Sequence, residues 1–128
     1  MNFGILGEAK IAREHVVPAI LNAGHKVTHV GRRIPGQAAL PKIYGNAIET
    51  DYEALINDTS VDAIYNPLPN HLHVPYSIEA LKANKHVLCE KPVALNLDEL
   101  SQLENAAKDS KAFFYEAFMV RSHPQWHW

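Results

Sequence analysis

The chain has 128 residues, a formal net charge of -2 and 47% hydrophobic residues, an ordinary composition for one globular domain. Its single cysteine, Cys89, excludes an internal disulfide, and no basic run is longer than Arg32-Arg33, so neither a nucleic-acid partner nor an anionic membrane is expected. No apolar run is long enough for a membrane span, and together with the lone thiol this predicts a cytoplasmic protein.

The hydrophobic pattern predicts six strands separated by helices. We expect strands over residues 2–6, 26–31, 44–48, 61–66, 86–89 and 112–117. We expect helices over residues 11–23, 37–42, 51–57, 75–83 and 96–108, with Asp51 as one cap and a capping box of Asn96 and Glu99 as another. Strands that alternate with helices predict a parallel sheet covered on both faces, a Rossmann-type doubly wound α/β domain. This domain should span residues 1–117, followed by an apolar tail over 118–128.

The loops that follow the strands are where such a sheet binds ligands, because the carboxyl ends of parallel strands meet at one edge. The first loop has the pattern GxAxxA and opens a helix directly after an apolar strand. Small residues there let backbone N–H groups approach a pyrophosphate. We therefore expect a dinucleotide to contact Gly7, Ala9, Lys10 and Ile11. The alternative is a tight turn whose small residues serve only packing.

The second loop carries Arg32 and Arg33 where an NAD-binding domain would place an acid on the ribose hydroxyls. No acidic residue occurs from His15 to Ile48. Two guanidinium groups with no carboxylate at that edge suit a 2′-phosphate, so the sequence favours NADP over NAD. The alternative is that both arginines are merely solvated.

The fourth loop combines a rigid turn with amide and imidazole groups that would line a nicotinamide ribose. We expect cofactor contacts from Asn66, Pro67, Leu68 and His71. A metal site at His71 and His73 is not expected, because no thiol or carboxylate lies near them in sequence. The pair His123 and His127 is a weaker candidate still.

The fifth loop, Cys89-Glu90-Lys91-Pro92, gives the sharpest signal for catalysis. A lysine at a strand end next to a carboxylate can hydrogen-bond a substrate oxygen and move a proton as hydride moves. We predict that Lys91 is catalytic. The alternative is a surface lysine paired with the nearby glutamate. Cys89 is expected to be a small core residue.

Four segments, taken in order, resemble the Gfo/Idh/MocA oxidoreductases, closest to the branch with glucose-fructose oxidoreductase and dihydrodiol dehydrogenase. They are GEAKIA, VDAIYNPLPNHLH, ALKANKHVLCEKP and YEAFMVRSHPQW, and they cover essentially the whole chain. The resemblance implies that Lys91 contacts the reacting hydroxyl or carbonyl and that Glu90 lies near the nicotinamide ribose. It also implies that Arg121 and Trp126 return toward the cofactor.

The implied reaction is reversible NADP-dependent hydride transfer at a secondary alcohol of a sugar, polyol or diol, with Lys91 polarising the oxygen. Family members continue into a second α/β domain that supplies most of the substrate pocket and commonly the subunit interface. We therefore expect little turnover from this chain alone, and a homo-oligomer is an open possibility. A non-catalytic NADP(H)-binding module or partner subunit is the alternative, and a protein that binds some other nucleotide comes last.

Overall fold

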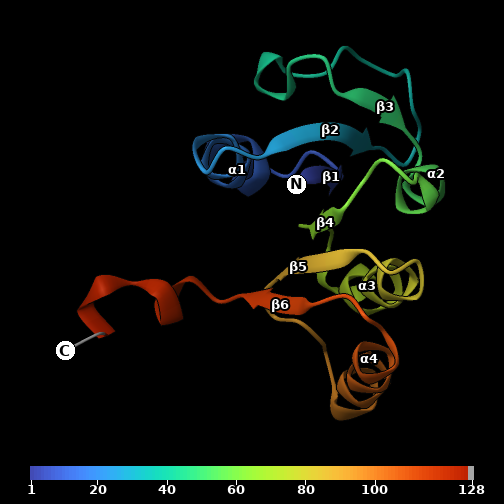
Figure 1. Ribbon diagram of the computed structural model, residues 1–128, viewed down its shortest axis with the longest axis vertical. Coiled ribbons are helices and arrows are strands. Elements are labelled where there is room, and N and C mark those ends of the chain that lie inside the picture. The colour runs from blue at the N-terminus through green and yellow to red at the C-terminus, as the bar shows by residue number, and fades with distance from the viewer. Residues whose placement is uncertain (127–128) are drawn as a thin grey trace.

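The computed structural model describes residues 1–126, and its strands form one parallel sheet (Figure 1). The sheet order is β3-β2-β1-β4-β5-β6, and every neighbouring pair is parallel. The strands are β1 (Asn2–Leu6), β2 (Lys26–Gly31), β3 (Ile48–Thr50), β4 (Ala63–Asn66), β5 (His86–Glu90) and β6 (Phe114–Ala117). The winding reverses between β1 and β4, as in a doubly wound sheet, which confirms the predicted Rossmann-type fold. His127 and Trp128 lie outside the described residues.

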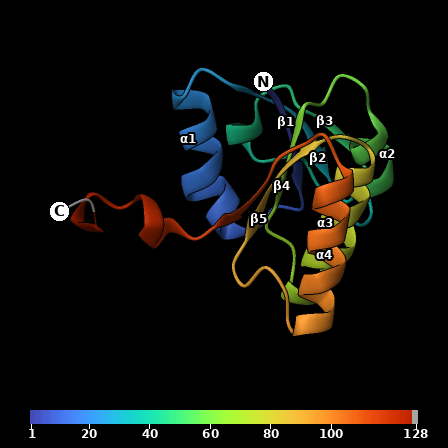
Figure 2. The ribbon, with the colours of Figure 1, turned by 60° about the horizontal axis from the view of Figure 1, so that its bottom comes forward.

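The helices are distributed unevenly over the two faces of the sheet. They are α1 (Val17–Asn22), α2 (Tyr52–Asn57), α3 (His73–Lys82) and α4 (Leu97–Asp109). Figures 1 and 2 show α1 on one face and the other three helices on the opposite face. Between α1 and β6 an apolar groove of about 770 Å³ stays open, so the α1 face is covered only in part. Among residues 1–126, no helix has both the length and the apolar character needed to span a bilayer.

The first helical stretch departs from the regular helix predicted for residues 11–23. It opens with a π turn over Ala12–Val16 and continues as α1. Pro18 accounts for the irregularity, because its nitrogen carries no hydrogen and the i→i−4 hydrogen bond is missing at that position.

The segment between β2 and α2 is where the predicted elements are wrong. Residues 37–42 form no α-helix, and the third strand is Ile48–Thr50 rather than 44–48. Tyr44 lies in a short 3-10 turn with its ring buried in the core, and Gly45 then turns the chain with a φ of 58°. The apolar residues of this segment therefore anchor a loop instead of pairing in the sheet.

Both predicted helix caps are confirmed. The Asp51 carboxylate accepts a hydrogen bond from the Ala54 N–H at 2.7 Å. The Asn96 side chain accepts from the Glu99 N–H at 2.9 Å, and Glu99 in return accepts from the Leu95 N–H at 2.8 Å. The returning bond reaches one residue further back than in the usual capping box.

The core consists of two apolar clusters, one on each face of the sheet. Successive residues of β1 serve both clusters, with Leu6 facing the α2 side and Ile5 facing the α1 side. Gly4 permits α2 to lie close against β1, because a Cβ there would come within 2.5 Å of the Leu55 side chain. Burying each such aliphatic side chain contributes roughly 1.5–3 kcal/mol.

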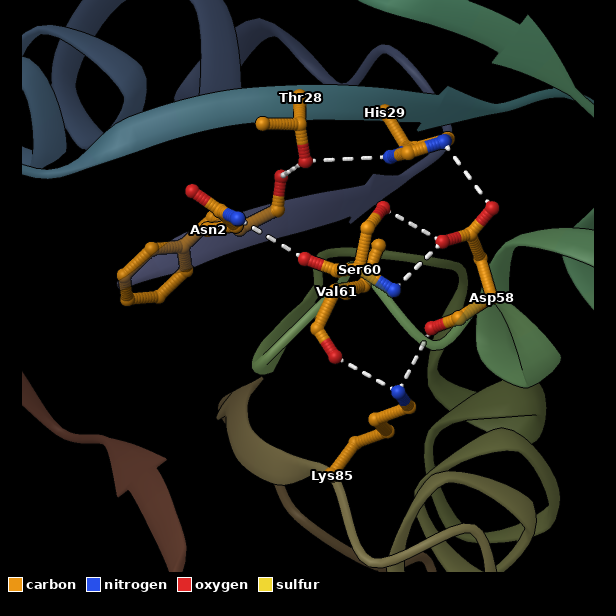
Figure 3. Close-up of polar contacts among 8 residues, drawn as sticks. Asn2, Thr28, His29, Asp58, Ser60, Val61 and Lys85 are labelled. Atoms are coloured by element: carbon orange, nitrogen blue, oxygen red, sulfur yellow. Dashed lines mark hydrogen bonds and ion pairs between the residues drawn. The ribbon is translucent and has the colours of Figure 1, made fainter.

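A polar network fastens the loops at the amino end of the sheet (Figure 3). The buried Lys85 donates from Nζ to the carbonyl oxygens of Asp58 at 2.7 Å and Val61 at 2.6 Å. The Asp58 carboxylate accepts from the Ser60 N–H at 2.8 Å and lies 3.5 Å from Nε2 of His29. The hydrogen bonds from Ser60 are the main reason that the pKa of Asp58 is lowered.

Candidate functional site

The turn after β1 lies at the switch point and presents bare backbone. Gly7 has a φ of 79°, a conformation that favours glycine, and its N–H donates to the Gly31 carbonyl at 2.8 Å. Leu68, from the loop after β4, lies directly over this turn, where a Cβ on Gly7 would be 3.2 Å from its Cδ2. The structure therefore brings Gly7 and Leu68, two of the residues expected to contact a cofactor, next to each other at this edge of the sheet.

The other predicted residues of this turn differ in orientation. The Ala9 carbonyl accepts from the Arg13 N–H at 3.2 Å, as one of the first bonds of the helix. Lys10 is exposed and its Nζ lies 3.9 Å from Glu14. Ile11 lines the apolar groove beside α1. The turn thus offers a ligand mainly backbone, with the exposed Lys10 beside it.

The two arginines after β2 have different surroundings. Nε and Nη2 of Arg32 each lie 2.5 Å from Oε2 of Glu8, and Nη1 donates to Glu49 at 3.1 Å. Only 12% of the Arg32 side chain is exposed. Arg33 is exposed, and within residues 1–126 its side chain forms no hydrogen bond or ion pair. The arginine that is free to receive an anion is Arg33.

The expectation that no carboxylate lies at this edge is therefore wrong. The stretch of sequence without acidic residues contains β2. Glu8 reaches Arg32 from the turn after β1 and Glu49 reaches it from β3, and these two strands are the neighbours of β2 in the sheet. Burial alone would lower the pKa of Arg32, but the hydrogen bonds and charges of the two glutamates raise it. The Gly36 N–H and then Arg32 lower the pKa of Glu49.

A hollow of about 460 Å³ beside these arginines is lined by the loop after β2, the start of α2, and the segment that follows β4. Arg33 and Tyr52 line it together with His71 and Tyr76, whose ring meets that of Tyr52 edge-on at 5.2 Å between centroids. Sequence reasoning placed His71 beside the nicotinamide ribose, whereas the structure places it in the same hollow as Arg33. Tyr52 was missed, although its position directly after the cap of α2 marks it as a residue at this edge.

The Asn66 side chain shapes the loop after β4. It is fully buried, and its Nδ2 donates to the His73 carbonyl at 3.1 Å and to Ser77 Oγ at 3.2 Å. Its Oδ1 accepts from the Leu68 N–H at 3.3 Å. Pro67 is buried as well. Both residues hold the loop in place, and neither presents its side chain to solvent.

His73 connects this loop to the one that carries Lys91, a role that sequence reasoning missed because it weighed this histidine only as a metal ligand. Its ring is 1% exposed, with Nδ1 at 2.8 Å from the Pro92 carbonyl and Nε2 at 2.6 Å from the Leu68 carbonyl. A neutral imidazole carries one N–H, so both nitrogens donate only in the protonated form. The described residues contain no group of three metal-ligating side chains.

Glu90 and Lys91 follow each other at the end of β5 but are not paired. Oε1 of Glu90 accepts from the Tyr65 hydroxyl at 2.7 Å, and burial together with this bond raises the pKa of Tyr65. Lys91 is exposed and, among the residues described, has no hydrogen-bond or ion-pair partner. The alternative of a surface lysine neutralised by the adjacent glutamate is thus not what the structure shows.

Three further residues were singled out in the sequence: Cys89, Arg121 and Trp126. Cys89 is buried as expected, and this burial raises its pKa to about 12. Arg121 lines a groove between α4 and β6, so the structure does not bring it to the crevice. Trp126 belongs to the short turn Pro124–Trp126.

Comparison with known proteins gives the family. Residues 1–118 match the oxidoreductase family with an NAD-binding Rossmann fold that is named after Gfo, Idh and MocA. The chain belongs to the Gfo/Idh/MocA family. It is 41% identical to an uncharacterised oxidoreductase of Rhizobium meliloti, with 98% of this chain and 39% of that protein covered. It is 38% identical to D-xylose 1-dehydrogenase (NADP(+)) 2 of Haloferax volcanii, with 97% and 39% covered.

A solved relative has the same fold. The 3-ketoreductase from Actinomadura kijaniata, in complex with TDP-benzene and NADP, superposes with a TM-score of 0.89 at 33% identity. The match covers 98% of this chain and 40% of that one. The chain thus spans about two fifths of the length of the relatives that it matches.

Proposed function

We propose that this chain is the cofactor-binding half of an NADP-dependent oxidoreductase that acts at a secondary alcohol or carbonyl carbon of a sugar, polyol or diol. The observation that carries the proposal is Lys91, an exposed lysine without a partner among residues 1–126, held at the carboxyl end of β5 close to the switch point. The names of the Haloferax dehydrogenase and the Actinomadura ketoreductase support both the cofactor and the substrate class.

The residues at this edge fit a dinucleotide phosphate. Small residues in the turn that follows Gly7 let backbone N–H groups approach a pyrophosphate. Arg33 is the free guanidinium for a 2′-phosphate. Tyr52 and His71 supply flat rings to the hollow beside it, where an adenine can stack.

Lys91 would perform the proton transfer. The bound nicotinamide supplies or accepts the hydride. In the reducing direction, the Lys91 ammonium hydrogen-bonds the carbonyl oxygen and gives it a proton as the carbon gains the hydride; in the oxidising direction, the amine takes the proton back. His73 acts on this step through the loop, because its bond to the Pro92 carbonyl anchors the residue that follows Lys91.

We propose residues 1–117 as the cofactor domain and 118–128 as the segment that leads out of it, with little turnover from the chain alone. Hydride transfer needs a substrate that is held in place and shielded from water. A reducing, cytoplasmic setting agrees with the free buried thiol of Cys89.

Calorimetric titration with NADPH and NADH tests the proposal. We expect NADPH to bind about tenfold more tightly than NADH, a difference of about 1.4 kcal/mol. Lys91→Ala should keep NADPH affinity within a few fold and abolish turnover in the full-length setting, because the lysine acts on substrate. Arg33→Ala should erase the preference for NADPH. Failure of the unmodified chain to bind NADPH would overturn the proposal.

A further inference from the structure

Glu8 lies where the cofactor preference is decided. It follows Gly7 in the turn after β1, and its Oε2 receives both Nε and Nη2 of Arg32. This is the planar edge of the guanidinium that a phosphate would engage with two parallel bonds. Within residues 1–126, Oε1 of Glu8 accepts no hydrogen bond, and the side chain is 24% exposed at a hollow of about 600 Å³ that Arg32 and Arg33 also line.

Arg32 is already paired with carboxylates. Glu8 and Glu49 both contact its guanidinium, and Arg33 lines the same hollow as Glu8. A phosphate monoester is nearly doubly charged at neutral pH, so it would be repelled by Glu8 and would need the same N–H groups that Glu8 occupies. A ribose hydroxyl, in contrast, can donate to a carboxylate at this edge, as it does in NAD-binding domains.

Glu49 does not share this position. Its Oε1 also accepts from the Gly36 N–H at 2.5 Å, so it holds the loop after β2 as well as Arg32. Glu8 bonds only Arg32 among the described residues. Replacing Glu8 should therefore change the charge at the hollow with little change to the fold.

We propose that Glu8 sets the cofactor specificity of this site by occupying the Nε–Nη2 edge of Arg32 against a 2′-phosphate and by accepting a ribose hydroxyl of NAD through its open oxygen. The inference rests on the proposed nucleotide-binding function. The site would then prefer NADP but also accept NAD. Arg33 would cause the preference for NADP, and Glu8 would reduce it.

The test compares Glu8→Gln with the unmodified chain in NADPH and NADH titrations. The variant keeps the size of the side chain and removes its charge. We expect the ratio of the NADH Kd to the NADPH Kd to rise about tenfold, with NADPH tighter and NADH weaker, because Arg32 becomes free for the phosphate while the ribose loses its acceptor. Glu8→Asp, which keeps the charge with a shorter reach, should lie between the two.

Glu14→Gln is the matched control, because it removes one negative charge from an exposed position in the first turn of the helical stretch that follows the Gly7 turn. It should leave the ratio unchanged; an equal rise in Glu14→Gln would assign the effect to net charge and overturn the inference. Weaker NADPH binding in Glu8→Gln, with its melting temperature unchanged, would also overturn it, because Glu8 would then serve to orient Arg32. If the unmodified chain binds neither nucleotide, the proposed function fails and this inference with it.

Discussion

Lys85 and Lys91 flank the same strand, β5, and have opposite surroundings. Lys85 precedes the strand at the amino end of the sheet, where it is 8% exposed and donates to two backbone carbonyls (Figure 3). Lys91 follows the strand at the carboxyl end, exposed and without a partner in the described chain. Lysine thus has two roles around β5: Lys85 supports the fold at one end, and Lys91 is available to a ligand at the other.

The contrast extends to neighbouring groups. At the amino end, Asp58 and His29 face each other and Ser60 bonds Asp58. At the carboxyl end, Arg33 and His71 are exposed in a shared hollow. The lysine at the amino end of β5 is thus part of a bonded network, whereas Lys91, Arg33 and His71 at the carboxyl end are exposed, and we expect a ligand to bind at that end. Each prediction below tests whether that division holds.

Removing the two lysines should give the largest difference. Lys85→Met leaves the carbonyls of Asp58 and Val61 without their donor, and we expect it to lower the free energy of unfolding by about 3 kcal/mol. Lys91→Met should change it by less than about 0.5 kcal/mol, as for an exposed residue. Urea unfolding followed by circular dichroism measures both. Equal losses would show that the two ends are not divided as described.

His73 and His71 extend the test within one loop. His73→Leu removes the ring whose two nitrogens contact the Leu68 and Pro92 carbonyls, and we expect a loss of about 2 kcal/mol in the free energy of unfolding. His71→Leu should leave stability within about 0.5 kcal/mol and weaken only nucleotide binding, because its ring is exposed. A stable His73→Leu protein would mean that the two carbonyls find other donors.

Acid should loosen the amino end through Asp58. Its pKa is lowered in the folded chain below the ordinary 3.8, first by the hydrogen bonds from Ser60. A lowered carboxyl pKa contributes stability that is present above the unfolded value and lost as the pH falls through the folded one. The gap in melting temperature between the unmodified chain and Asp58→Asn should therefore close between about pH 5 and about pH 2. A difference in melting temperature that stays constant over this range would show that the ionised Asp58 carboxylate does not stabilise the fold.

The smallest change in stability is expected at Tyr44, a buried polar group that is not hydrogen-bonded within the described residues. Its buried hydroxyl has no hydrogen-bond partner within residues 1–126, and burial raises its pKa to about 12. Tyr44→Phe should leave the free energy of unfolding unchanged or raise it by up to about 1 kcal/mol, since no bond is lost. A clear loss of stability in thermal unfolding would reveal a partner for the hydroxyl.

Local patterns in the sequence were enough for most strands and helices, the caps at Asp51 and Asn96, and the turn at Gly7, because each depends on residues a few positions apart. They failed between β2 and α2, where residues 37–42 form no α-helix and Tyr44 is buried without joining a strand. The partners of Arg32 were not predictable in this way, since Glu8 and Glu49 reach it from the strands on either side of β2. The contacts of His73 escaped for the same reason, as its second carbonyl, that of Pro92, belongs to the next loop.

The strand order also determines when the site can form during synthesis. β1 is synthesised before the other five strands of this sheet, but one of its two neighbours, β4, begins only at Ala63. β1, β2 and β3 can pair early, whereas Leu68 contacts the Gly7 turn only after β4 has paired with β1. Such non-local pairing is slow. A dinucleotide that contacts loops on both sides of the β1–β4 pair would bind only after β1 and β4 have paired. Its binding would therefore shift the folding equilibrium toward the paired sheet.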